Sequence, residues 1–188
     1  MKRFIIILTL SILSIGITTA QQQEHFKFKG IPIDGPVSTF RSKLIADGFT
    51  EVKKGVFSGK FLRQNCMVSL VADDNNMIWR VAAVFPQSDT WSTIEAQFNS
   101  HVALYTEKYG KPTSISREFG TYTSDHPGLK MSAINDGECR YIAIWKTQYG
   151  EIDVRIIKGS GYRTGAVRVA YTDKANKNAV HQSDLDEI

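Results

Sequence analysis

Cysteine and histidine are scarce in this chain, and their spacing limits the chemistry that it can support. Only 2 of the 188 residues are Cys and 4 are His. No His stands at ligand spacing from a Cys or from another His, as a structural zinc site would require. We therefore expect no metal site and no cofactor.

The sequence also lacks a clustered stripe of basic residues. The formal net charge is +4, and it falls to +2 if Lys2 and Arg3 are removed with an N-terminal leader. Nucleic-acid-binding proteins usually concentrate Lys and Arg on one face or along one helix. We therefore expect no nucleic-acid partner.

Long apolar runs are missing except near the N-terminus. There, Lys2 and Arg3 precede an apolar stretch at residues 4–17, and Thr18 and Ala20 supply small residues before a cleavage point. The stretch is shorter than the ~20 residues that a helix needs to cross a bilayer. We predict a signal peptide over residues 1–20, a periplasmic or secreted location, and no transmembrane segment in the mature chain.

A polar turn between two apolar strands occurs twice, at residues 66–85 and 139–158. The second hairpin lies 73 residues after the first, and this shift also places Val81 on Val154. The pattern predicts a diverged tandem repeat with halves at residues 25–86 and 87–172, which together form one domain.

Helical spacing of apolar residues predicts two helices, at residues 36–47 and 90–109. Most other segments alternate in the manner of strands, including residues 130–134. Residues 173–188 lack apolar periodicity, and we predict a flexible polar tail there. The fold class that follows is α+β, with an antiparallel sheet and two helices on one of its faces.

A helix followed by antiparallel strands, used twice, resembles the β-lactamase-inhibitor-protein-like fold. The helix end at residues 105–112 and the segment at residues 28–35 are similar to small uncharacterised exported proteins of Gram-negative bacteria. In inhibitors of this fold, the open sheet face binds a protein partner. The resemblance implies an exported binding protein, and it assigns no contact residue here.

Cys66 and Cys139 occupy equivalent places in the two predicted hairpins. In one continuous sheet these strands would lie several spacings of ~4.8 Å apart, whereas a disulfide needs Cα atoms within about 7 Å. A continuous sheet therefore predicts two free buried thiols, and a folded-over sandwich would allow a disulfide.

Three polar motifs are better explained by turns than by chemistry. The run Ser124-Asp125-His126 has the letters of a hydrolase triad, but adjacent residues cannot supply its geometry. The glycine-rich segment at residues 158–165 is followed by a strand pattern, not by the helix of a phosphate-binding loop. Residues 73–76 lack the spaced ligands of a calcium loop. We predict no catalytic residue.

The strongest functional signal is a set of cationic and aromatic residues on the predicted strands. By alternation, many of the arginines should lie on the sheet face away from the helices, and arginine, tyrosine and tryptophan are typical interface anchors. A solvated face whose cations discourage aggregation is the competing interpretation. The predicted binding residues are Arg80, Arg140, Trp145, Arg155 and Tyr162.

These observations favour an exported, non-enzymatic binding module that holds an envelope or extracellular protein on its helix-free face. The alternative is a protein that binds a carbohydrate or another small ligand through Trp145, Tyr149 and Tyr162. A hydrolase has the least support, because no acid, base and nucleophile converge in the sequence.

Overall fold

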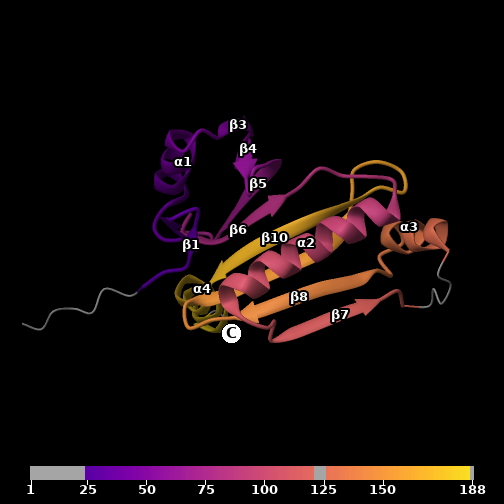
Figure 1. Ribbon diagram of the computed structural model, residues 1–188. Helices are drawn as coiled ribbons and strands as arrows, with labels where there is room; N and C mark the ends of the chain where they lie inside the picture. Colours follow the sequence, from indigo (N-terminus) through magenta and orange to yellow (C-terminus); the bar gives the residue numbers. More distant parts are fainter. Residues whose placement is uncertain (1–23, 121–125, 187–188) are drawn as a thin grey trace, which may run out of the picture.

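A computed structural model describes residues 24–120 and 126–186 and shows one eight-stranded antiparallel sheet (Figure 1). The strand order is β3-β4-β5-β6-β10-β9-β8-β7, and a separate two-stranded hairpin, β1-β2, lies near the N-terminal end. The strands are β1 (Lys27–Phe28), β2 (Ile31–Pro32), β3 (Thr50–Lys53), β4 (Val56–Phe61), β5 (Gln64–Ala72), β6 (Ile78–Val84), β7 (Ser114–Glu118), β8 (Arg140–Lys146), β9 (Gly150–Lys158) and β10 (Gly165–Asp173). The helices are α1 (Val37–Ala46), α2 (Trp91–Tyr109), α3 (Pro127–Asn135) and α4 (Lys174–Asp186).

The α+β class is confirmed, and the sheet is continuous across the two predicted halves. Each half contributes four strands in sequence, and the last strands of the halves, β6 and β10, pair at the centre with Ala83 opposite Val169. A shift of 73 residues aligns β5 with β8. In the sheet, however, β5 is next to the central strand of its half, whereas β8 is one strand further from the centre. The tandem repeat stays a prediction.

The core lies between α2 and one face of the sheet. Ile94, Phe98 and Val102 are buried on α2, which contacts β9 and β10. Figure 1 shows α2 running along the sheet in front of β10 and β8. The helix predicted at residues 90–109 from the spacing of its apolar residues is thus confirmed as α2. The buried strand residues on the same face include Val81, Ala83, Ile152, Val154, Val167, Val169 and Tyr171.

The predicted strand at residues 130–134 is wrong, because this segment belongs to α3. Pro127 occupies the first turn, where its missing N–H costs no hydrogen bond. The ring Nδ1 of His126 accepts a hydrogen bond from the Gly128 N–H at 3.2 Å. A proline and a cap therefore start a helix where the apolar pattern alone suggested a strand.

The predicted flexible tail is also wrong over most of its length, because residues 174–186 form α4. The Asp173 carboxylate accepts a hydrogen bond from the Asn176 N–H at 2.9 Å, as an N-cap residue does. The Asn176 side-chain amide donates to the carbonyls of Ile33 and Ile78. Hydrogen bonds at its first turn, not an apolar stripe, hold this helix to the sheet.

Both cysteines are free, so the disulfide is excluded. Cys66 lies on β5 and Cys139 immediately precedes β8, and three strands lie between β5 and β8. Four strand spacings put the two strands roughly 19 Å apart, far beyond the reach of a disulfide. The alternative of a continuous sheet with two free thiols is confirmed.

Candidate functional site

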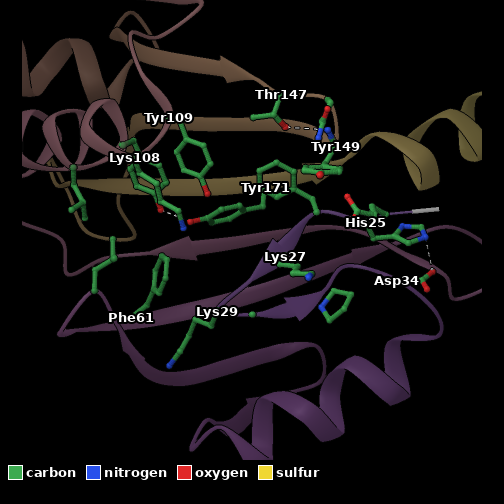
Figure 2. Close-up of a pocket in the computed structure, with 18 residues that line it drawn as sticks. His25, Lys27, Lys29, Asp34, Phe61, Lys108, Tyr109, Thr147, Tyr149 and Tyr171 are labelled. Carbon is green, nitrogen blue, oxygen red and sulfur yellow. Dashed lines mark hydrogen bonds and ion pairs between the residues drawn. The ribbon is translucent and has the colours of Figure 1, made fainter. Parts of the chain in front are cut away.

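A groove lies between the N-terminal segment, the C-terminal end of α2 and the turn before β9. Its volume is about 1120 Å³. Figure 2 shows Tyr109, Tyr149 and Tyr171 along one side and Phe61, Lys27 and Lys29 along the other. Six of its lining residues are Phe or Tyr, and they come from segments that are far apart in the sequence. The remaining lining residues include Glu24, His25, Phe26, Asp34, Leu104, Tyr105, Lys108 and Thr147.

The floor of the groove is a packed set of aromatic rings. The hydroxyls of Tyr105 and Tyr171 share a hydrogen bond of 2.5 Å. The ring of Tyr105 stacks on Tyr109 with centroids 6.0 Å apart, and the ring of Phe26 lies 5.5 Å from that of Tyr171. Tyr105 and Tyr171 are buried, while Tyr109 is half-buried and presents its ring to the groove. Such a floor offers flat faces against which a ring or an apolar chain can pack.

One wall is held in place by the buried carboxylate of Asp173. It accepts a hydrogen bond from the Phe26 N–H at 2.7 Å, and the Nδ1 of His25 lies 3.2 Å from it. The other ring nitrogen of His25, Nε2, lies 3.5 Å from the Asp34 carboxylate. The same Asp173 that caps α4 therefore fixes the N-terminal segment against the groove.

The turn before β9 forms the opposite wall and is also hydrogen-bonded. The hydroxyl of Thr147 accepts hydrogen bonds from the N–H groups of Tyr149 and Gly150, each at 3.2 Å. The Lys174 N–H donates to the Tyr149 carbonyl. Hydrogen bonds within the turn and one from α4 therefore hold the backbone of Tyr149 in place.

The rim of the groove carries charged side chains of both signs. Lys27, Lys29 and Lys108 line it together with Glu24 and Asp34. Lys29 is paired with Asp47 at 2.7 Å, so its charge is largely offset. Among the described residues, Lys27 and Lys108 have no ion-pair partner. These two ammonium groups are available for a negatively charged ligand.

The tyrosines of the groove are neutral hydrogen-bonding groups. Burial raises the pKa of Tyr105 and of Tyr171, and the hydrogen bond with the Glu24 carboxylate raises the pKa of Tyr149. Their hydroxyls therefore keep their protons at neutral pH. Among the described residues, no three His, Cys, Asp or Glu side chains gather in a way that could hold a metal ion. The groups that the groove offers to a ligand are aromatic rings, neutral hydroxyls and ammonium groups.

The aromatic residues singled out from the sequence are not brought together. Trp145 is buried, and its Nε1 donates to the Gly110 carbonyl at 2.9 Å, so it cannot stack on a ligand. Tyr149 lines the groove just before β9. Tyr162 is 81% exposed in the loop after β9, at the opposite end of that strand. Of the three, only Tyr149 belongs to the candidate site.

The arginines lie on the other face of the sheet, where two of the predicted residues meet. Arg80 and Arg155 both bond the carboxylate of Asp153, at 2.5 Å and 2.7 Å. Arg168 joins them, also at 2.7 Å. Arg140 is further along this face on β8, next to the edge strand β7, where it is in register with Glu118. Two of the predicted arginines thus meet at a buried aspartate, Asp153, that the sequence analysis did not identify. That this face binds a partner stays a prediction.

Apart from Tyr149, the groove residues were not identified from the sequence, because they come from distant segments. Phe26, Tyr105, Tyr149 and Tyr171 are brought together only by the sheet register and by the docking of the N-terminal segment. A local signal existed on α2, where Lys108 and Tyr109 follow the last core residue, Tyr105. The spacing of Tyr105 and Tyr109 predicts a helix, but it does not by itself predict a ligand site.

Comparisons with protein families, with curated proteins and with solved structures give no match to this chain. Within the described residues, no helix has both the length and the apolar character needed to cross a membrane. The resemblance to β-lactamase-inhibitor-like exported proteins therefore stays a prediction.

Proposed function

We propose that this protein is an exported, non-enzymatic binding protein, and that its groove takes a small ligand with a ring-shaped or apolar body and a negatively charged group. The observation that carries the proposal is the aromatic floor of the groove together with Lys27 and Lys108 at its rim. Export is supported by the leader pattern at residues 1–20, which lie outside the described residues.

The groove is large enough for this ligand class. Its volume of about 1120 Å³ is slightly above the roughly 300–1,000 Å³ of typical small-molecule sites, which are mostly apolar with a few placed polar groups. The aromatic faces would hold the body of the ligand, and the ammonium groups would orient its anionic end. An acidic sugar or an amphipathic carboxylate has this chemistry.

The test uses 8-anilinonaphthalene-1-sulfonate, a fluorescent probe with an aromatic body and one sulfonate. We expect saturable binding to the folded protein. Competition by a galacturonate oligomer would indicate an acidic sugar as the ligand, and competition by decanoate would indicate an amphipathic carboxylate. The double variant Tyr109→Ala/Lys108→Gln should weaken probe binding at least about fivefold, because it removes one ring and one cation from the groove.

The chain offers a matched control for this variant. Arg163 lies over the ring of Tyr162 at 5.6 Å, much as Lys108 lies over Tyr109 at 5.2 Å, but at the other end of β9. The variant Tyr162→Ala/Arg163→Gln should leave binding unchanged. Equal loss in both variants, or no saturable binding by a protein that unfolds cooperatively, would refute the proposal.

A further inference from the structure

The sheet face opposite the groove carries a second, separate cluster, which we call the arginine face: Asp153 and the three arginines that surround it, Arg80, Arg155 and Arg168. The side chain of Asp153 is 2% exposed, and those of the arginines are 24–37% exposed. Three guanidinium groups against one carboxylate leave an excess charge of +2. The Asp153 carboxylate holds the three arginines together but offsets only one of their three positive charges.

The hydrogen-bonding capacity of these arginines is far from used up. Arg80 and Arg168 each donate through Nη2 to Asp153, and Arg155 donates through Nε. The Nε of Arg168 is buried and has no hydrogen-bond partner. Since a guanidinium carries five N–H donors in a fork that fits a carboxylate, the cluster can accept a second carboxylate above Asp153.

The acidic residues that flank the arginines stand opposite basic residues in the sheet register. Glu151 is on the same face and directly opposite Lys146 on β8, and its charge also acts on Arg80. Glu118 stands opposite Arg140 at the β7 edge. The excess charge of +2 counts the guanidinium groups and the Asp153 carboxylate alone.

Apolar side chains lie on both sides of the arginines. In the sheet register, Arg168 stands between Val84 on β6 and Arg155 on β9, and Ile142 on β8 follows Arg155. Met67 stands beyond Val84 and is 40% exposed. A ligand that reaches the arginines therefore also meets aliphatic surface, which is the composition of a protein interface centre.

A hollow adjoins the arginine face where β8 begins and β9 ends. Its volume is about 910 Å³, and its lining includes the apolar Ile142 and Ile157, the basic Arg140, Arg155 and Lys158, and the acidic Glu118 and Asp136. The face is thus concave on one side of Arg155. A short segment of chain can enter there while its acidic side chain meets the arginines.

We infer that the arginine face binds a protein segment in which an Asp or Glu stands beside bulky apolar or aromatic residues. The inference is independent of the ligand proposed for the groove, because Tyr171 of the groove and Arg168 point to opposite faces of β10. The partner carboxylate meets Arg155 and Arg168, and its apolar neighbours cover Ile142 on one side and Val84 and Met67 on the other.

The test measures binding of a random glutamate–tyrosine copolymer and of polyglutamate by calorimetry with the full mature chain. We expect the copolymer to bind more tightly than polyglutamate, and both to bind more weakly as salt is raised. Arg155→Gln should weaken copolymer binding at least about fivefold. Asp153→Asn should tighten it by about threefold or more, because it removes the competing negative charge.

Arg41 provides the matched control. Its Nε bonds a carboxylate in the same way as that of Arg155, at 2.6 Å from Glu51, but on α1 and β3. Arg41→Gln should leave copolymer binding unchanged. The inference would be overturned by equal effects of Arg41→Gln and Arg155→Gln, by weaker binding to Asp153→Asn that is still folded, or by equal affinity for polyglutamate and the copolymer. Displacement of the copolymer by millimolar phosphate at constant ionic strength would assign the site to a small oxyanion instead.

Discussion

At the scale of single residues, burial controls the reactivity of the two thiols. Desolvation raises the pKa of Cys66 and of Cys139 to about 11. Only the thiolate is nucleophilic, so at pH 8 each folded thiol should react about a hundredfold more slowly than an unfolded one, even before shielding is counted. The folded state favours the protonated thiol, so this contribution to stability is complete below about pH 9 and is lost as pH rises toward 11.

Alkylation with iodoacetamide checks the prediction for the thiols. The unreduced protein should react slowly when folded at pH 8, and it should show two reactive thiols in 6 M guanidinium. Fast modification of the folded protein would contradict the burial argument. Fewer than two thiols after unfolding without reductant would contradict the separation of β5 and β8.

Single residues also show what the sequence could and could not predict about the sites. Alternation along the strands placed Arg80 and Arg155 on one face, because the direction of a strand side chain follows from its position. The role of Asp153 could not be predicted in this way, since two of its partners lie on β6 and β10. Trp145 was assigned to binding by its residue type, and only the packing of α2 shows that it is buried.

At the scale of elements, Asp173 joins three segments at one end of the sheet. It is fully buried at the end of β10, and its carboxylate holds the Phe26 N–H and the Asn176 N–H. Asp173→Ala should lower the free energy of unfolding by about 2–4 kcal/mol, because it leaves a buried N–H unpaired and removes the cap of α4. Urea denaturation measures this loss.

Asp34→Ala is the control for the Asp173 variant. Asp34 also lies near His25, but its side chain is 49% exposed. An exposed carboxylate of this kind contributes less than about 1 kcal/mol. Similar losses in the two variants would show that the N-terminal segment is not held through Asp173.

The elements that sequence patterns misassigned share one cause. α1, α2 and the long strands were predicted from apolar periodicity, which reports contact with the core. α3 and α4 are defined by their starts instead, with Pro127 after the His126 cap in one and Asp173 before the first turn in the other. A cap is a short-range signal of one or two residues, so a search for periodicity passes over it.

At the scale of the whole molecule, one continuous sheet separates two surfaces of different character. The aromatic groove is on the side of the sheet that faces α2, and the arginine face is on the other side. Both surfaces use the central strand β10, through Tyr171 on one side and Arg168 on the other. The same alternation that builds the core therefore gives the protein two separate surfaces, for each of which we propose a different ligand.

The most direct test of the proposed function is to map the bound probe on the folded protein. Amide chemical shifts of the ¹⁵N-labelled chain would be followed while 8-anilinonaphthalene-1-sulfonate is added. We predict that the largest changes fall on Leu104, Tyr109, Thr147 and Tyr149, which line the groove. Met67 and Ile142, which flank the arginine face, should stay unchanged. Changes confined to the arginine face, or the absence of any localised change, would contradict the account.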